Sequence, residues 1–347
     1  MRIGHRDIGI AVRPFIIAEM SGNHNQSLER ALTIVRAAAE AGAHAIKLQT
    51  YTADTITLDV DSGDFRIEDA NSPWKGSNLH DLYELAHTPW DWHQPIMQTA
   101  HGLGLLCFST PFDETAVDFL ESIDVPAYKI ASFEAVHLPL IRKVAATGKP
   151  IVISTGMATL AEIDDAVRAA REAGNVDLAL LKCTSTYPAS PDNTNVRTIP
   201  HLRGAFGCEV GLSDHTMGFG TAVAAVACGA TIIEKHFTLR RSDGGVDSAF
   251  SLEPEELRTL VIETERAWQS LGEVSYGPTE QERSSLKFRR SIYISANMAA
   301  GDVFTPQNLR CVRPGMGLPP KHYESLLGRR VRREVKKGTP MDWSLLD

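Results

Sequence analysis

The hexapeptide Ile232-Ile-Glu-Lys-His-Phe237 combines an apolar run typical of a buried strand with three adjacent ionisable side chains. Burying an ionisable group costs free energy unless that group has a partner or a chemical task. The stretch therefore indicates either a core with internally paired charges or a strand whose end opens into a functional site. Because successive side chains of a strand face opposite sides, Glu234 and His236 share one face and Lys235 occupies the other.

Short apolar runs of this kind occur eight times in the first 280 residues, alternating with longer helical patterns such as 27–41, 114–122 and 160–173. The runs are 15–20, 45–50, 105–110, 127–132, 150–155, 178–184, 210–215 and 231–236. Alternating strands and helices predict parallel strands joined by crossover helices. Eight such units predict a (β/α)8 TIM barrel. A doubly wound open sheet is the competing architecture, but no GxGxxG or P-loop sequence supports it.

From residue 290 the pattern changes to short strands separated by Gly and Pro turns, as in Gly301-Asp-Val-Phe-Thr-Pro306. We predict a barrel domain at residues 1–280, a linker at 281–289 and a small β-rich domain at 290–347. Residues 281–347 carry 13 Lys and Arg against 6 Asp and Glu, whereas residues 1–280 carry 22 against 37. A basic tail can indicate nucleic-acid binding, but there is no zinc-finger spacing or RNA-recognition signature. We expect no nucleic-acid partner, and a basic face that is solvated or packs on an acidic surface.

Composition narrows the class of protein further. A content of 43% hydrophobic and 22% charged residues is typical of a soluble globular chain. No run of about 18 apolar residues is present, so we expect no membrane span. The first residues lack the apolar segment of a signal peptide, and the five cysteines form no CxxC pair. This cysteine usage suits a reducing compartment, so we expect a cytoplasmic protein.

Nearly every predicted strand finishes in a polar or ionisable residue, which a packed barrel interior does not need. These residues are Glu19, Lys47, Gln49, Ser109, Thr110, Lys129, Ser132, Glu134, Ser154, Thr155, Lys182, Thr184, Ser213, His215, Glu234 and His236. Barrel enzymes hold their catalytic groups at the C-terminal ends of the strands. One polar strand end is usually structural, but eight in succession predict an active site.

Two histidines form a candidate metal site. His215 shares a face of the seventh strand with Ser213, and His236 shares a face of the eighth strand with Glu234. Adjacent strands lie about 4.8 Å apart, so both imidazoles can converge on one ion. Two nitrogens with oxygen ligands and open positions suit a divalent ion, Mn²⁺ or Mg²⁺ above all, with Glu234 and Asp247 as nearby carboxylates. Taken alone, the pair would more often be core or hydrogen-bonded histidines.

The same strand ends supply cationic and hydroxyl donors for an anion such as phosphate, to which lysine contributes a point charge. The donors are Lys47, Thr110, Lys129, Ser132, Ser154 and Ser213. The alternative is that the two lysines pair with Glu19 and Glu134 for structure alone. Lys129 and Ser132 have opposite parity, so the strand must bend or end between them if both reach one ligand.

At these residues the chain resembles the sialic acid synthase family over essentially its whole length. The matching motifs are Ile17-Ala-Glu-Met-Ser-Gly-Asn-His24, Ile46-Lys-Leu-Gln-Thr50, Phe108-Ser-Thr-Pro-Phe112, Tyr128-Lys-Ile-Ala-Ser-Phe-Glu134, Ile153-Ser-Thr-Gly156, Gly211-Leu-Ser-Asp-His-Thr216 and Ile233-Glu-Lys-His-Phe237. The tail, with Val312-Arg-Pro-Gly315 and Leu326-Leu-Gly328, resembles that family's antifreeze-like (SAF) domain, a β-clip fold. Ile130-Ala-Ser-Phe-Glu134 and Leu181-Lys-Cys-Thr-Ser-Thr-Tyr-Pro188 are similar to the pseudaminic acid branch rather than the N-acetylneuraminate branch.

The resemblance implies a metal-dependent transferase that condenses phosphoenolpyruvate with an N-acetylated amino sugar, giving a nonulosonic acid and phosphate. In the pseudaminic branch the sugar is 2,4-diacetamido-2,4,6-trideoxy-β-L-altropyranose, and the product enters a bacterial surface or flagellar glycan. It implies phosphoenolpyruvate binding by the six donors named above. It implies sugar binding by Gln49, Glu134, Tyr187 and Asp247. Glu19 and Glu134 are the candidates for proton transfer, with Lys129 as a further catalytic group.

The resemblance also implies a domain-swapped homodimer, in which the small domain of one chain covers the barrel mouth of the other. Arg313 matches the arginine that reaches the partner's sugar. Phe133 replaces a small residue of the neuraminate branch, and we expect it to pack against a 6-deoxy methyl group. Segment 71–76 departs from the neuraminate pattern, so we assign no sugar-binding residue there.

Three other functions stay open at this point. The chain could be an N-acetylneuraminate or legionaminate synthase of the same family. It could be a noncatalytic carbohydrate- or ice-binding protein that uses its SAF domain, which would not need Lys47, Lys129 and the paired histidines. It could also be a metal-dependent sugar-phosphate aldolase or isomerase on the same barrel, which would turn over without releasing phosphate.

Overall fold

The computed structural model describes residues 1–68 and 74–347, so residues 71–73 of segment 71–76 lie outside the described residues. The chain divides into two compact units, Met1–Gly272 and Glu273–Asp347. The domain limits expected at residues 280 and 290 remain predictions. Within the described ranges, no helix combines the length and apolar character needed to cross a bilayer.

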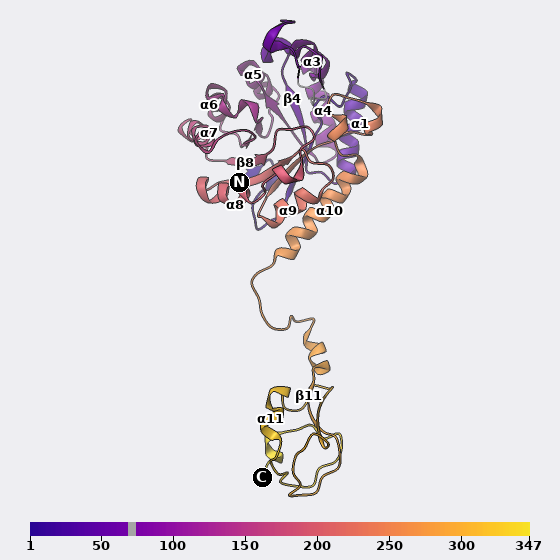
Figure 1. The fold of residues 1–347 in the computed structure, drawn as a ribbon. Coiled ribbons are helices and arrows are strands. Elements are labelled where there is room, and N and C mark those ends of the chain that lie inside the picture. Colours follow the sequence, from indigo (N-terminus) through magenta and orange to yellow (C-terminus); the bar gives the residue numbers. More distant parts are fainter. Residues whose placement is uncertain (69–73) are drawn as a thin grey trace. The chain divides into compact units, whose positions relative to one another are not determined.

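The first unit is a closed barrel of parallel strands in the order β10-β3-β4-β5-β6-β7-β8-β9 (Figure 1). The strands are β3 (Phe15–Glu19), β4 (Ala45–Thr50), β5 (Leu106–Pro111), β6 (Tyr128–Ile130), β7 (Ile151–Ser154), β8 (Leu178–Cys183), β9 (Glu209–Asp214) and β10 (Ile232–His236). Each coincides with one of the eight apolar runs, and the predicted (β/α)8 barrel is confirmed. A short hairpin, β1 (Arg2–Ile3) and β2 (Arg6–Asp7), precedes it.

Helices follow the strands around the outside of the barrel (Figure 1). They are α1 (Leu28–Glu40), α2 (Ala53–Ile56), α3 (Leu79–Ala86), α4 (Trp90–Gly102), α5 (Glu114–Ser122), α6 (Leu138–Ala146), α7 (Leu160–Glu172), α8 (Thr198–Phe206), α9 (Gly220–Ala227) and α10 (Pro254–Leu271). A 3-10 turn, η2 (Phe133–Val136), comes between β6 and α6.

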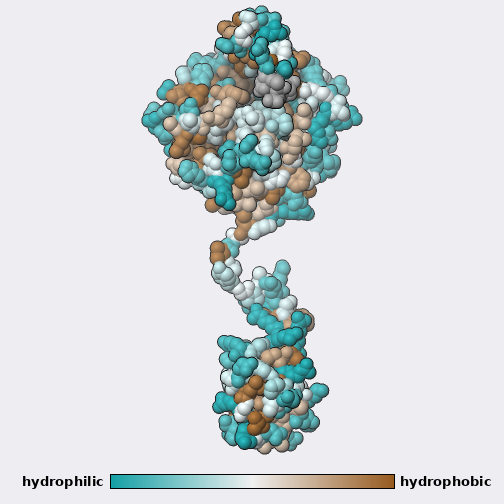
Figure 2. Space-filling view, in the orientation of Figure 1, coloured by the Kyte–Doolittle hydropathy of each residue, from teal (hydrophilic) through white to brown (hydrophobic). Residues whose placement is uncertain are grey.

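Helix α7 illustrates how the sequence sets these boundaries. The Thr159 hydroxyl accepts a hydrogen bond from the Glu162 N–H, and the Glu162 carboxylate accepts one from the Thr159 N–H, which completes a capping box. Ile163, Ala166 and Ala170 are buried at helical spacing. The helix therefore buries one side only. On the face of the first unit that Figure 2 shows, hydrophilic residues are interspersed with hydrophobic ones.

The interior of the barrel is apolar toward the N-terminal ends of the strands, where Phe15, Ile17, Phe108, Val152 and Ile232 belong to one buried cluster. Ionisable residues take over the inward positions further along the same strands. The change occurs within single strands, because Ile17 is followed two residues later by Glu19 and Ile232 by Glu234. The barrel interior is thus apolar at the N-terminal ends of the strands and carries ionisable residues at their carboxyl ends, a region here called the polar mouth.

Lys235 lies on the outer face of β10, as its parity predicts. Its ammonium donates to the Asp214 carboxylate at 2.8 Å and also to the Thr216 carbonyl. Asp214 is directly opposite Lys235 in the β9–β10 register. Both side chains are almost completely buried, so Lys235 has the partner that a buried ammonium group needs.

The second unit has a core of its own, formed by residues such as Ile292, Ile294, Phe304, Leu309 and Val331. Its strands β11 (Ser291–Ile294) and β12 (Leu309–Val312) pair antiparallel, and α11 (Tyr323–Leu326) follows. This arrangement confirms the predicted small β-rich domain.

Gly211 in β9 is a packing constraint that substitution can test. A Cβ there would lie 2.7 Å from Ile232 Cβ and 2.8 Å from Leu181 Cδ2, and still closer to the Ile232 carbonyl oxygen. We expect Gly211→Ala to lower the free energy of unfolding by about 3 kcal/mol, the upper part of the range for overpacked cores, as measured by urea denaturation. Gly204→Ala, in α8 with no atom within 4 Å of the added Cβ, should raise stability by about 0.5–1 kcal/mol. Equal effects of the two substitutions would contradict this account.

Candidate active site

The polar strand ends converge at the carboxyl end of the barrel. Strand register places Glu19 opposite Lys47 and Glu234 opposite Ser213. Side-chain contacts between these strands, described below, show that the residues face inward together. Lys182 is an exception, because its ammonium bonds to the Cys183 carbonyl and lines a separate cavity with Arg197 and His201.

Lys47 is the centre of a buried charge cluster. Its Nζ lies 2.6 Å from Glu19 Oε2 and 3.9 Å from Glu234 Oε2, and it donates to Thr110 Oγ1 at 3.0 Å. Burial lowers the pKa of Lys47, but the two carboxylates outweigh burial and hold it above its usual value. Lys47 is therefore a fixed cation at the mouth of the barrel.

The two carboxylates beside Lys47 differ in their proton affinity. Burial raises the pKa of Glu19 to about 7 despite the attraction of Lys47, and Glu234 adds to the rise. Burial also acts against ionised Glu234, but Lys47, Lys129 and the Ser213 hydroxyl, which donates at 3.0 Å, together lower its pKa. Glu234 is thus ionised at neutral pH, whereas Glu19 is close to its titration point.

Lys129 has a different environment. Its Nζ donates to Ser154 Oγ at 2.6 Å and to the Ile130 carbonyl at 2.7 Å, and burial lowers its pKa. No carboxylate of the residues that the structure describes forms an ion pair with it within 4.0 Å. The alternative that both lysines form purely structural ion pairs therefore holds for Lys47, which pairs with Glu19. It does not hold for Lys129, which does not pair with Glu134.

The parity conflict between Lys129 and Ser132 is resolved by the end of the strand. Strand β6 stops at Ile130, and Ser132 takes a helical backbone conformation. Its hydroxyl accepts a hydrogen bond from the Gly156 N–H at 3.1 Å. Ser132 is thereby brought beside β7, whose Ser154 contacts Lys129.

The two histidines lie side by side, with ring centroids 5.3 Å apart. His215 Nδ1 is 3.0 Å from the Thr184 carbonyl. A carbonyl only accepts, so Nδ1 carries the proton and Nε2 keeps its lone pair. His236 Nδ1 is buried and has no hydrogen-bond partner among the described residues, and Asp247 Oδ2 lies 3.6 Å from it. Burial, with His215 second, lowers the pKa of His236 far below its usual value, which leaves the neutral form that binds metals.

This pair fits a metal ion held by few protein ligands. Across residues 1–68 and 74–347, no group of three or more His, Cys, Asp or Glu side chains is arranged to hold a metal. The unpartnered Nδ1 of His236 and the available Nε2 of His215 are nevertheless suitable donors. The remaining ligands would then be oxygens of water or of a substrate.

A cavity of about 480 Å³ opens beside His236, a size in the range of small-molecule sites. The four sugar-binding candidates of the barrel line it, namely Gln49, Glu134, Tyr187 and Asp247. An apolar wall that includes Ile56, Leu82 and Phe133 completes the cavity. The structure thus brings these four candidates together in one place, although their role stays a prediction.

Glu134 is the acid–base candidate within this cavity. It lies in η2, and its Oε2 is buried and accepts no hydrogen bond from the part of the chain that the structure describes. Burial raises the pKa of Glu134 to about 7, and the Lys129 charge only partly opposes the rise. A carboxyl group poised near neutral pH is suited to proton transfer.

Several residues of the site escaped sequence reasoning. Ser21 has a positive φ of 47° just after β3, and its hydroxyl donates to Asp247. Cys183 faces His215, with Sγ 3.8 Å from Nδ1. Burial raises the Cys183 pKa, but the His215 contact more than offsets it, giving a pKa of about 7. The parity that Cys183 shares with Leu181 could have identified it, whereas no periodic signal marks Ser21, Tyr51 or Tyr83.

Arg313 belongs to the second unit. It directly follows β12 and is exposed. Its predicted contact with a sugar in a partner chain stays a prediction.

The closed barrel and the ionisable groups gathered at the carboxyl ends of its strands define a (β/α)8-barrel enzyme. A family model described as the NeuB family matches residues 34–276, and one described as the SAF domain matches residues 289–347. The chain belongs to the NeuB family, which confirms the family resemblance read from the motifs.

Relatives of known name support this assignment. The chain is 45% identical over 324 residues to a pseudaminic acid synthase of Campylobacter jejuni, covering 93% of this chain and 94% of the relative. It is 34% identical over 350 residues to the N,N'-diacetyllegionaminic acid synthase of Legionella pneumophila, covering 99% and 98%. Among solved structures, N-acetylneuraminic acid (sialic acid) synthetase from Leptospira borgpetersenii in complex with citrate matches with a TM-score of 0.72 and 32% identity, covering 83% of this chain and 95% of that chain.

Glu134→Gln should reveal the raised pKa of this carboxyl group as a pH-dependent stability difference. The folded state favours the neutral acid, so the stabilisation that Glu134 contributes is fully present below about pH 4.5 and is lost as the pH rises through about 7. Relative to the unmodified chain, Glu134→Gln should therefore gain on the order of 2 kcal/mol in unfolding free energy between pH 4.5 and pH 8. Urea denaturation at both pH values measures this difference.

Glu172→Gln provides the matched control, because Glu172 is exposed at the end of α7. Its stability relative to the unmodified chain should change little between the two pH values. A Glu134→Gln profile parallel to that of the control would contradict the raised pKa.

Proposed function

We propose that this chain is a pseudaminic acid synthase, which condenses phosphoenolpyruvate with 2,4-diacetamido-2,4,6-trideoxy-L-altrose to give pseudaminic acid and phosphate. The observation that carries the proposal is Lys129, a buried lysine that forms no ion pair with a carboxylate of the described residues and lies in the same barrel mouth as Lys47 and the paired imidazoles. The choice of branch rests on the greater identity to the Campylobacter jejuni relative than to the Legionella pneumophila relative. N-acetylneuraminate or legionaminate synthesis remains the alternative.

Phosphoenolpyruvate would bind in the polar mouth. Its phosphate and carboxylate need cations and hydroxyl donors, which Lys47 and Lys129 supply together with Thr110, Ser132, Ser154 and Ser213. Lys129 would gain the counter-ion that it lacks. Lys47, already neutralised by Glu19 and Glu234, would mainly orient the ligand through its remaining hydrogen-bonding capacity.

His215 and His236 would hold the divalent ion, Mn²⁺ or Mg²⁺. When bound there, the ion supplies Lewis-acid polarisation of the open-chain sugar aldehyde. The His215 pKa is raised, since Cys183 and the Thr184 carbonyl outweigh burial. Binding of the ion therefore requires His215 to release any proton it carries at neutral pH.

The reaction joins C3 of phosphoenolpyruvate to the aldehyde carbon, whose oxygen takes up a proton. Water then adds to C2 and loses a proton, and the bond from C2 to the phosphate oxygen breaks as phosphate leaves. Glu134 lines the cavity with His236 and is suited to this proton transfer, since its pKa is raised to about 7. Glu19 is the second candidate, but its contact with Lys47 orients it toward the phosphoenolpyruvate side.

Sugar selection would use the apolar wall of the cavity. Phe133, Ile56 and Leu82 offer contacts for the 6-deoxy methyl and the two N-acetyl methyl groups. Gln49, Tyr187 and Asp247 offer the hydrogen bonds that a polyhydroxylated chain needs. An apolar wall favours a 6-deoxy sugar over one with additional hydroxyl groups.

The remaining proposals concern assembly and location. We place the enzyme in the cytoplasm, in keeping with its five free cysteines. We propose a domain-swapped homodimer in which Arg313 of one chain contacts the sugar in the barrel of its partner. The basic tail and the acidic barrel have the complementary charge that such docking would use.

Phosphate release from phosphoenolpyruvate, measured with a panel of amino sugars with and without chelator, tests the reaction and its branch. We expect turnover with the diacetamido altrose sugar at least about tenfold faster than with N-acetylmannosamine, because additional hydroxyl groups must be desolvated against the apolar wall. Chelation should abolish turnover, and added Mn²⁺ or Mg²⁺ should restore it. Preference for N-acetylmannosamine would overturn the branch, and full activity in chelator would overturn the metal assignment.

Mixed dimers test the contribution of Arg313 across chains. An Arg313→Ala chain keeps a complete barrel, and a His236→Ala chain keeps a complete tail, so one of the two sites in each mixed dimer should work. Each variant alone should be inactive, and an equal mixture that exchanges subunits freely should recover about a quarter of the original activity. Arg310→Ala, an exposed arginine in the same strand β12, serves as the control and should stay active. A mixture no more active than its components would count against the swap.

A further inference from the structure

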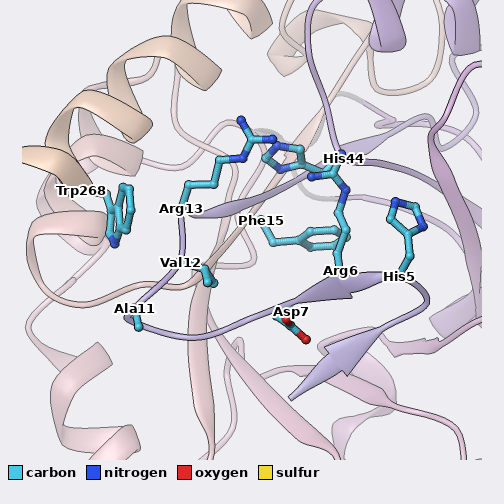
Figure 3. Close-up of a pocket in the computed structure, with 9 residues that line it drawn as sticks. All are labelled: His5, Arg6, Asp7, Ala11, Val12, Arg13, Phe15, His44 and Trp268. Carbon is cyan, nitrogen blue, oxygen red and sulfur yellow. The ribbon is translucent and has the colours of Figure 1, made fainter.

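A second cavity lies at the opposite, N-terminal end of the barrel strands. It encloses about 590 Å³ and is lined by His5, Arg6, Asp7, Ala11, Val12, Arg13, Phe15, His44 and Trp268 (Figure 3). Phe15 opens β3 and His44 directly precedes β4, whereas the candidate active site begins at the far ends of these strands. We propose that this cavity, here called the basal pocket, binds a small organic phosphate.

Arg6 is the first argument for an anionic ligand. Its Nε is buried and makes no hydrogen bond, and in the described parts of the chain no carboxylate pairs with the guanidinium within 4.0 Å. Asp7 is adjacent in sequence, but its carboxylate points away from both guanidinium groups in Figure 3 and is 4.0 Å from Arg2. Nε is therefore a buried donor that has lost its hydrogen bond to water without gaining another, which costs free energy.

Arg13 brings a second positive charge to the same place. Figure 3 shows its guanidinium and that of Arg6 on either side of the His44 imidazole. The nearest carboxylate to Arg13 is that of Glu265, 3.7 Å away, and both side chains are substantially solvent-exposed. Such an exposed pair contributes little. Two guanidinium groups therefore lie close together, and within residues 1–68 and 74–347 no buried carboxylate forms an ion pair with either of them. The first 280 residues nevertheless hold far more acidic than basic residues.

His44 supplies a neutral donor between the two arginines. It is 6% exposed, and its Nδ1 accepts a hydrogen bond from the Ile16 N–H at 2.9 Å. Nδ1 must therefore be unprotonated, so the single ring proton resides on Nε2. Burial, followed by Arg6 and Arg13, lowers the pKa of His44 to about 3, so the ring stays neutral. Guanidinium forks and an N–H donor together match the oxygens of a phosphate.

The size and walls of the basal pocket indicate an organic phosphate rather than the inorganic ion. Phe15 stacks on His44 with a centroid separation of 5.8 Å and an interplanar angle of 18°. Val12 and Trp268 add further apolar surface, and Trp268 is fixed by donation from Nε1 to the Ile10 carbonyl at 3.0 Å. A phosphate held by Arg6, Arg13 and His44 leaves room for a carbon skeleton or a planar ring against this wall.

Calorimetric titration of the full chain with AMP and with inorganic phosphate tests the basal pocket. Phosphoenolpyruvate is kept saturating, without sugar, so that the polar mouth is filled and no turnover occurs. We expect one equivalent of AMP to bind, and to bind at least about tenfold more tightly than inorganic phosphate because of the apolar wall. Arg6→Gln with Arg13→Gln should weaken AMP binding by about a hundredfold, since each charged contact contributes roughly a factor of ten.

Controls separate this site from the catalytic one. Arg2→Gln, an exposed arginine of the same hairpin, should bind AMP as the unmodified chain does, and Arg6→Lys should retain part of the affinity. The double variant should still bind one equivalent of phosphoenolpyruvate at the polar mouth and should keep the thermal midpoint of the unmodified chain. These two results would exclude misfolding. A second equivalent of phosphoenolpyruvate in the unmodified chain, absent from the double variant, would identify that organic phosphate itself as a ligand of the pocket.

Several outcomes would overturn the proposal. In the first, the unmodified chain binds only one equivalent of phosphoenolpyruvate and shows no saturable binding of AMP or inorganic phosphate at millimolar concentrations. In the second, the Arg2→Gln chain and the double variant bind AMP with equal affinity. Inorganic phosphate binding as tightly as AMP would overturn the assignment of an organic ligand. None of these results depends on which sugar the enzyme uses, so they can be distinguished from a failure of the proposed reaction.

Discussion

A single buried ammonium group connects half of the barrel mouth. Lys47 in β4 contacts Glu19 in β3, Glu234 in β10 and Thr110 in β5, which are four consecutive strands of the closed sheet. Charges this deep are tolerated only when they are paired and hydrogen-bonded. Burial raises the pKa of Glu19 to about 7, and Glu234, which shares Lys47 with it, adds to the rise, whereas Lys47, Lys129 and Ser213 together keep Glu234 ionised. The protonation states of the two carboxylates thus follow from their burial and from their sharing of Lys47.

The sequence predicted those features that depend on periodicity. Apolar runs of regular spacing located all eight barrel strands, and alternation along them assigned Glu234 and His236 to the mouth and Lys235 to the outside. Features that depend on the conformation of loops could not be predicted from the sequence. Ser21 reaches Asp247 only because its backbone turns to a positive φ. Tyr51 lines the cavity from the segment after β4, and Tyr83 lines it from α3, a helix that lies between barrel strands. The lack of a counter-ion at Lys129 depends on where η2 places Glu134, which no local pattern specifies.

Both ends of the barrel hold cations, but in different surroundings. At the carboxyl end, Lys47 is already paired and Lys129 is not. At the N-terminal end, Arg6 and Arg13 flank a neutral imidazole. An apolar layer that includes Phe15, Ile17 and Phe108 separates the two ends. This layer keeps water out of the barrel interior and separates the carboxylates of the mouth from Arg6 and Arg13 along the strands.

The buried Lys235–Asp214 pair has a consequence for how the barrel assembles. Side chains alternate along a strand, so a slip of β10 by one residue would exchange its two faces. Lys235 would then enter the mouth beside Lys47, and Glu234 would face the apolar layer under the helices, where Asp214 would have lost its cation. Each of these exchanges would leave a charge buried and unpaired. The hexapeptide Ile232-Ile-Glu-Lys-His-Phe237 therefore specifies its own register, since the charges that form the site also destabilise a misaligned final strand.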